Sequence, residues 1–248
     1  MRFILRPILS EIKEFYQNPI SKDRFKEYLS KLQGDTKGDM VLPISGFNPM
    51  AKDHLLLKIE ELEHLHTEDI MEETIEDCNK VLAESIDISE DEIVVVLNIA
   101  DDLKGSWTNY YTTDFDSKFK LNAFVNRNFC VPYFWTSEGY TQETIRKRTK
   151  EYLYRTLYRL NNANPVSLEE HFDQEVFVAA KSMTTIGDID KSSLEAIEKF
   201  YLEHKDSEEY NLIFGFFYGD QGSESLNYMT FGINGITGYD YAKYKSVV

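Results

Sequence analysis

The sequence predicts an α+β fold, in which one helix-rich domain surrounds a small mixed or antiparallel sheet and the N-terminal third is helical. Three observations predict it. Apolar residues recur at helical spacing through the first 88 residues, strand-like runs are few and irregularly spaced, and helical segments stand in groups between them. A regular alternation of strand and helix, which is typical of a parallel sheet, is not visible. We therefore expect a single domain over residues 1–248, with a helical part at 1–88 and an α+β part at 89–248.

The N-terminal part is expected to hold two short helices and then a helix pair. The short helices are expected at 8–16 and 21–32, and Gly34 ends the second of them. Apolar stripes beginning at Leu55 and at Met71 predict the pair, joined near residues 66 and 67. The stretch 34–49 holds three Gly and two Pro, which indicates an internal linker or a long functional loop.

The negative charge is concentrated in one segment. The chain carries 27 basic and 43 acidic residues, a net charge of -16, and residues 60–92 hold 14 acidic side chains beside Lys80 alone. On the second helix of the pair, Glu72, Glu73, Glu76 and Asp77 lie opposite the apolar stripe, so we expect an acidic helix face. This balance excludes a general nucleic-acid binder held by phosphate contacts. The acidic face either binds a basic protein partner or is a solvated surface.

Three runs are expected to be strands. Residues 93–99 (IVVVLNI) resemble a strand covered on both faces, and 210–218 (YNLIFGFFY) has similar composition. Residues 128–135 (NFCVPYFW) contain Pro132, which favours a sheet edge or a bulge.

Three helices are expected between the last two of these runs. One covers 141–160, and capping boxes at Ser167 with Glu170 and at Ser192 with Glu195 open the others. Six of the 12 glycines fall between 215 and 238, which predicts turns and short strands there, followed by a last helical turn near 239–244.

Neither a membrane span nor a secretory signal is expected. The longest apolar runs, 93–100 and 212–219, are shorter than the 18 residues that indicate a membrane helix. The first residues lack the apolar region and cleavage site of a signal peptide, and two cysteines, Cys78 and Cys130, are too few for a disulfide framework. We expect a cytoplasmic protein that does not enter a membrane.

Polar and aromatic residues follow two of the predicted strands, which is where binding residues gather on a rigid scaffold. Asp114 and Glu138 supply carboxylates there, and together with His171 they are the candidate catalytic residues. The candidate ligand-binding residues are Trp107, Asn109, Tyr111, Trp135, Arg148 and Arg155. The alternative is an irregular sheet edge whose aromatic residues bury area and find one polar partner each.

A metal site is considered because His171 and Glu175 lie four residues apart and project from one face of a helix. With Asp114 as third ligand they would bind a divalent metal, the one cofactor that the sequence brings into question. The simpler alternative is that His171 bonds to a neighbouring group.

Arginines on the 141–160 helix have two interpretations. Arg148 and Arg155 flank its apolar face and can converge on a small anionic ligand, or they pair with carboxylates of the chain itself. Internal pairing is the interpretation that the abundance of acidic residues favours.

Two function classes follow. The first is a ligand-binding or protein-interaction protein with an acidic helix face. The alternative is a metal-dependent or small-molecule enzyme, plausibly a hydrolase, with a polar-aromatic pocket. The sequence does not decide whether the protein is an enzyme.

Overall fold

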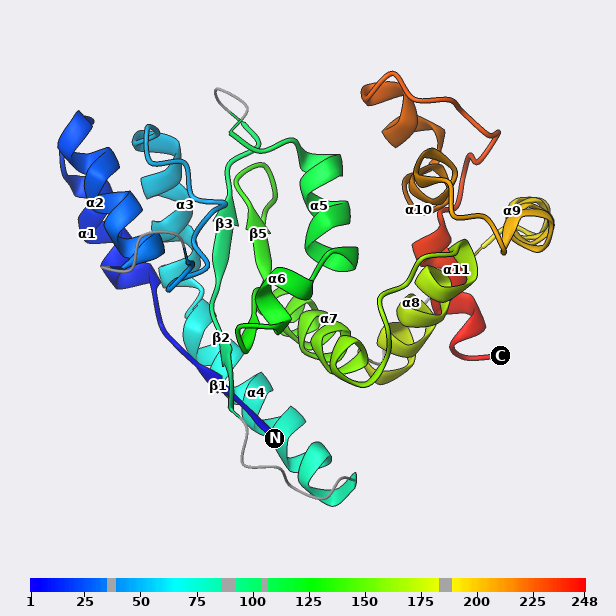
Figure 1. Ribbon diagram of the computed structural model, residues 1–248, viewed down its shortest axis with the longest axis horizontal. Helices are drawn as coiled ribbons and strands as arrows, with labels where there is room; N and C mark the ends of the chain where they lie inside the picture. The colour runs from blue at the N-terminus through cyan, green and yellow to red at the C-terminus, as the bar shows by residue number, and fades with distance from the viewer. Residues whose placement is uncertain (35–38, 86–91, 104–106, 183–188) are drawn as a thin grey trace. The chain divides into compact units, whose positions relative to one another are not determined.

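The computed structural model describes residues 1–34, 39–85, 92–103, 107–182 and 189–248. The chain divides into two compact units (Figure 1). Unit 1 comprises Met1–Ser117 and Leu121–Leu153, and unit 2 comprises Lys118–Lys120 and Tyr154–Val248. The expectation of a single domain stays a prediction.

Unit 1 contains a small parallel sheet. Its strands are β1 (Arg2–Leu5), β2 (Glu92–Val95), β3 (Asn98–Ala100), β4 (Phe129–Cys130) and β5 (Tyr133–Trp135). The strand orders are β1-β2-β4 and β3-β5, and every strand pair is parallel. The backbone amide of Val96 donates to the carbonyl of Cys130 and that of Asn98 donates to Pro132, which continues the pairing between the two groups of strands.

The expectation of a mixed or antiparallel sheet was therefore wrong. Parallel neighbours need a long crossover connection, and here each crossover carries helices. The first crossover runs over residues 6–91 and holds four helices among its described residues, so the alternation of strand and helix is too uneven to see in the sequence. The four-residue strand β1 was also missed, because so short a run shows no clear period.

Seven helices in the described part of the chain belong wholly or partly to unit 1, and all but those at Tyr110–Phe119 and Asn122–Val125 match expected helices. They are α1 (Leu9–Gln17), α2 (Lys22–Gln33), α3 (Asp53–His64), α4 (Thr67–Ser85), α5 (Tyr110–Phe119), α6 (Asn122–Val125) and α7 (Gln142–Asn161), of which α5 and α7 run across the division between the units. Ser21 caps α2 by accepting from the amide of Arg24, and Gly34 ends that helix with a positive φ of 61°. The helix pair predicted around residues 66 and 67 is confirmed as α3 and α4.

The central strands are covered on both faces, as the sequence predicts. Ile93 is 2% exposed, and Val95, Leu97 and Ile99 are fully buried. In Figure 1, α1 to α3 lie on one side of β3 and β5, and α5 lies on the other. Pro132 stands between β4 and β5, and β4 is an edge strand of its sheet among the described residues, which confirms the interpretation of that proline.

Unit 2 is helical in the part that the structure describes. Besides the end of α7, it contains α8 (Leu168–Ser182), α9 (Lys191–His204), α10 (Tyr210–Ser225) and α11 (Gly238–Lys245). The strand expected at 210–218 was wrong, because those residues form the first part of α10, with Phe214, Phe216 and Phe217 buried. A helix that is apolar all round gives the same continuous run as a buried strand, so periodicity cannot separate them.

The expectations for the helix caps and for the C-terminal residues of unit 2 are confirmed in part. The capping box at α8 is confirmed, since Glu170 accepts from the amide of Ser167 and its own amide donates to the Ser167 hydroxyl. The one expected at Ser192 was wrong, because Asp190 caps α9 by accepting from the amide of Ser193. Helix α11 confirms the last helical turn, whereas no short strand is found among the described residues between 215 and 238.

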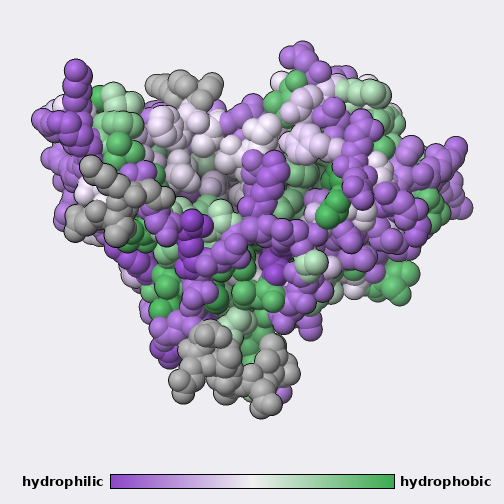
Figure 2. Space-filling view, in the orientation of Figure 1, coloured by the Kyte–Doolittle hydropathy of each residue, from purple (hydrophilic) through white to green (hydrophobic). Residues whose placement is uncertain are grey.

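No helix in the described ranges is long and apolar enough to cross a membrane. On the face drawn in Figure 2, hydrophilic residues predominate, and hydrophobic ones stand among them in smaller patches. Cys78 and Cys130 are buried thiols. In the described part of 34–49 there is no helix or strand, and Ile44 and Phe47 of this stretch are buried in the core. Whether 34–49 is a linker or a functional loop stays a prediction.

Candidate functional site

Strands β3 and β5 are paired in parallel, with Ala100 opposite Trp135 in the register, so both end at one edge of the sheet. Asp101 and Asp102 follow β3 at this edge, and Thr136 follows β5. Parallel pairing therefore brings two segments that are 35 residues apart to one place, where their polar side chains meet.

The carboxylate of Asp101 is fully buried and is held by side chains from three parts of unit 1. Its Oδ1 lies 2.9 Å from Nε2 of His54, in the first turn of α3, and 3.3 Å from the hydroxyl of Thr136. Its Oδ2 accepts from the amide of Asn48 at 2.8 Å. A buried carboxylate needs such donors, because an uncompensated charge in the protein interior is costly.

The loop that supplies Asn48 is itself fixed. The hydroxyl of Tyr16 donates to the carbonyl of Asn48 at 2.7 Å, and burial raises the pKa of this tyrosine well above its usual value, so it remains a donor. The guanidinium of Arg24 donates to the carbonyl of Ala51 at 2.6 Å. Helices α1 and α2 thus hold the loop against the sheet edge.

His54 has one ring nitrogen committed to the carboxylate. Because Asp101 is an acceptor, we expect a proton on Nε2, and in the neutral imidazole Nδ1 is then an acceptor. The side chain is 16% exposed, and Nδ1 has no hydrogen-bond partner among the described residues. The imidazole is therefore oriented from one side and can accept a hydrogen bond on the other.

Asp102 receives only neutral donors from the described part of the chain. Its Oδ1 accepts from the Thr136 hydroxyl at 2.8 Å and from the amide of Ser137 at 3.0 Å, and its Oδ2 accepts from the Ser137 hydroxyl at 2.5 Å. No Lys, Arg or His among the described residues lies within ion-pair distance of it. The carboxylate is partly exposed and Ser137 is exposed, so this negative charge can be reached from solvent.

Trp107 presents an aromatic surface at the same edge. The ring is 40% exposed, and its Nε1 donates to the carbonyl of Ser45 at 3.1 Å. The next residue, Thr108, donates from both its amide and its hydroxyl to the carbonyl of Asp101, at 3.0 and 2.8 Å. These bonds fix the position of a large aromatic side chain that is not buried in the core.

Glu138 and Arg148 bind one another, with Nη2 and Oε2 2.6 Å apart. Glu138 also accepts from the hydroxyls of Tyr110 and Tyr140, and burial raises the pKa of both tyrosines. Trp135 is 1% exposed and packs against Tyr110 with ring centroids 4.7 Å apart. Internal pairing of the arginines is thus confirmed here, and both Glu138 and Trp135 belong to a packed network.

Three other candidate residues lie in α5 or directly before it. The side chain of Asn109 accepts from the amide of Thr112 and so caps the helix. Tyr111 packs edge-on against Tyr110, and Asp114 is 5% exposed.

The remaining candidates belong to unit 2. Both oxygens of Glu175 accept from Arg155, at 2.8 and 2.6 Å, and the two side chains are 4% and 3% exposed. His171 lies 2.7 Å from the carbonyl of Ser167 through Nδ1, and burial lowers its pKa. Asp114 belongs to unit 1, whereas His171 and Glu175 belong to unit 2, so this ligand set stays a prediction. In the described ranges no group of three or more His, Cys, Asp and Glu side chains is placed to hold a metal ion.

Sequence reasoning missed the residues that organise the edge. Asp101 and Asp102 were visible as a polar end to the strand, whereas His54 showed no partner pattern. Its partner lies 47 residues away in the sequence, and only the packing of α3 beside the sheet brings them together.

The comparisons with family models, with curated proteins and with solved structures give no match for this chain.

Proposed function

We propose that the protein binds a small cationic molecule, an amine or an ammonium compound, at the carboxyl edge of β3 and β5. The binding residues are His54, Asp102, Trp107 and Ser137, which we call the edge site. The observation that carries the proposal is the partly exposed carboxylate of Asp102, whose bonds to described residues all come from neutral donors.

The edge site offers acceptors and negative charge. Nδ1 of His54 and the carboxylate of Asp102 accept hydrogen bonds, and the Ser137 oxygen retains a lone pair. A protonated amine such as putrescine has N–H donors and no acceptor, so it complements this set, whereas the quaternary ammonium of choline, which has no N–H, complements the negative charge alone. The exposed ring of Trp107 adds a face of the kind that attracts cations most strongly.

The location and the overall charge support the same ligand. In open parallel sheets with helices on both faces, ligands bind outside the carboxyl ends of the strands. The net charge of -16 raises the local concentration of cations around the protein. The binding of an anionic ligand, by contrast, is less favoured, because Arg148 and Arg155, the arginines expected to bind it, are each paired with a carboxylate of the chain.

The test is a thermal-shift titration of the full chain with choline and putrescine. A ligand that binds only the folded state at about a hundred times its Kd adds about 2.7 kcal/mol of stability, which is a measurable rise in Tm. The uncharged isostere 3,3-dimethyl-1-butanol and acetate are expected to leave Tm unchanged. Equal shifts with choline and its uncharged isostere would contradict the proposal.

Variants locate the binding. Asp102→Asn removes the charge and is expected to abolish the shift, and Asp206→Asn, at an exposed position of unit 2, is the matched control that keeps it. Should the first variant fold poorly, Trp107→Leu tests the aromatic face independently, since its ring is already 40% exposed. A shift that survives both changes rules out the edge site.

The two classes expected from the sequence remain predictions beside this one. The acidic face of α4 is exposed, with Glu73 paired to Arg146 at 2.7 Å and Asp77 paired to Lys80 at 3.0 Å. Exposure of this kind is expected of a solvated helix as well as of a partner surface. The metal-dependent hydrolase gains no support from the described residues.

A further inference from the structure

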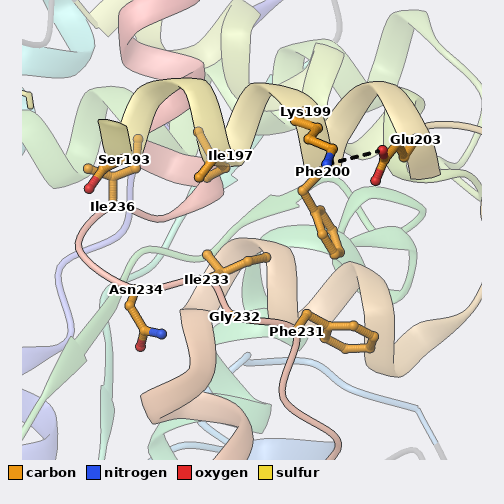
Figure 3. A pocket seen from close by; sticks show the side chains of 11 residues that line it. Ser193, Ile197, Lys199, Phe200, Glu203, Phe231, Gly232, Ile233, Asn234 and Ile236 are labelled. Carbon is orange, nitrogen blue, oxygen red and sulfur yellow. Dashed lines mark ion pairs between the residues drawn. The ribbon is translucent and has the colours of Figure 1, made fainter. Parts of the chain in front are cut away.

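Unit 2 contains a pocket of about 230 Å³ between α9 and the loop that follows α10. Ile197 and Phe200 line it from α9, and Phe231, Ile233 and Ile236 line it from the loop. In Figure 3, Phe200 points from the helix toward the loop, and Ile233 lies on the loop, on the opposite side of the pocket from the helix. We call this cavity the α9 pocket; all its lining residues belong to unit 2.

Apolar and aromatic side chains form one part of the wall of the α9 pocket, and Ser193, Lys199, Glu203 and Asn234 form its polar part. Ile197, Ile233 and Ile236 are 2%, 7% and 8% exposed, so they form a packed base. The half-buried rings of Phe200 and Phe231 stand edge to face, with centroids 5.7 Å apart, and Phe200 also stacks on Phe216. Aromatic rings in this arrangement present edges and faces to a third ring.

The loop is held in place by a single carboxylate. Oδ1 of Asp220 accepts from the amides of Phe231 and Ile233, at 2.9 and 3.3 Å, and Oδ2 accepts from the side chain of Asn234. The amide of Asp220 donates back to the carbonyl of Ile233. Gly235, at a φ of 92°, passes so close to Ser193 that a Cβ there would lie 2.9 Å from its hydroxyl oxygen. These contacts fix the backbone of the loop that forms one side of the pocket.

The charges around the α9 pocket balance. Lys199 and Glu203 are 3.9 Å apart and largely exposed on α9, and the other side chains that line the pocket are uncharged. An ionic ligand would find no unpaired opposite charge in this lining, and burying a charge without a partner is costly.

The volume sets the size of the ligand. Drug-sized ligands occupy pockets of roughly 300–1,000 Å³. An apolar cavity of about 150 Å³ lined by Leu, Ile and Phe binds benzene. We infer that the α9 pocket binds a small neutral aromatic molecule with one ring, a ligand class and a location distinct from those of the edge site.

The experiment is an NMR titration of the full chain, labelled at isoleucine methyl groups, with 4-methylphenol. The methyl signals of Ile197, Ile233 and Ile236 are expected to shift together and to saturate with a Kd of about 1 mM or lower, as an efficient ligand of this size does. The anion 4-methylbenzoate is expected to cause no saturable shift. Shifts that grow linearly without saturation, or equal binding of the anion, would overturn the inference.

A matched pair of helix variants completes the test. Ala196 lines the pocket from an exposed position of α9, so Ala196→Phe places a ring in the cavity without removing a core residue. It is expected to weaken binding at least tenfold, while Leu202→Phe, at an exposed position of the same helix outside the pocket, leaves the Kd unchanged. Unchanged binding by the Ala196→Phe variant would contradict the assignment. The Asp102→Asn variant must bind 4-methylphenol as the wild type does, which separates this outcome from that of the edge site.

Discussion

Asp101 and His54 lie 47 positions apart in the sequence, yet Oδ1 of the first and Nε2 of the second are 2.9 Å apart, and the carboxylate is fully buried. This contact joins the first turn of α3 to the end of β3. It fixes the imidazole of His54 against the residue that precedes Asp102, and the proposed edge site depends on it.

Asp101→Asn is expected to lower the free energy of unfolding by about 1–3 kcal/mol. The substitution replaces one carboxylate oxygen by an NH₂ group, which cannot accept the hydrogen bonds that the carboxylate accepts. Asn48 and His54 then compete for a single remaining acceptor. Urea denaturation measures the change, and Asp206→Asn at an exposed position is the control, with an effect within about 0.5 kcal/mol. Equal stability of the two variants would show that the buried network contributes little.

The buried ion pair of unit 2 is expected to behave non-additively. Glu175→Met leaves the guanidinium of Arg155 buried without its carboxylate and should cost about 3–5 kcal/mol. Adding Arg155→Met removes the stranded charge, so the double variant should be more stable than the single one. A double-mutant cycle by chemical denaturation measures this, and simple additivity of the two losses would contradict it.

Gly219 is expected to be required for the bend inside α10. Its φ of 67° and ψ of -176° fall in a region that only glycine adopts readily, and a Cβ there would lie 3.0 Å from the carbonyl of Ile233. Gly219→Ala should therefore cost about 1–3 kcal/mol of stability. Gly139→Ala is the control, since a Cβ there meets nothing within 4 Å. Thermal unfolding of the two variants distinguishes a required glycine from a tolerated one.

His171 makes stability depend on pH in a defined direction. Burial lowers its pKa, so the unfolded chain, with a pKa of about 6.5, binds the proton more tightly than the folded protein does. Its contribution to stability is fully present above that value and is lost as the pH falls toward the lower pKa of the folded state, by up to about 1.4 kcal/mol per pH unit.

His171→Gln removes this titration and should flatten the fall in unfolding free energy between pH 7.5 and pH 5.5, measured by urea denaturation at each pH. An unchanged slope would mean that the folded protein accommodates the protonated imidazole. The absolute stability of the variant does not enter the comparison, because only the pH dependence is tested.

Helices with one apolar face could be predicted from the sequence, and helices buried all round could not. Met71, Ile75 and Cys78 recur at helical spacing with acidic residues between them, and this spacing predicted α4 correctly. The period of a half-buried helix is visible in the spacing of its apolar residues. The residues around Phe214 and Phe217 are apolar on every side, so α10 has no visible period.

The direction of the strands and the polar pairs between distant residues could not be predicted either, because both depend on how distant segments of the chain pack together. The IVVVLNI run was visible as a buried strand, but its parallel pairing depends on where the helices of residues 6–91 return the chain. The path of these helices also places His54 beside Asp101, and this contact cannot be predicted from the spacing of residues within either segment. Candidates such as Trp107 were found because they directly follow a strand in sequence.

The central claim, a cation at the edge site, is tested most directly by an NMR titration of the ¹⁵N-labelled full chain with choline and with putrescine. The backbone amides of Asp102, Thr108 and Ser137 and the indole N–H of Trp107 are predicted to shift together and to saturate with at least one of the two. Amides of unit 2 and the signals recorded with 3,3-dimethyl-1-butanol are predicted to stay in place. If neither cation moves the edge-site signals, or if the uncharged isostere moves them equally, the edge site does not bind cationic ligands.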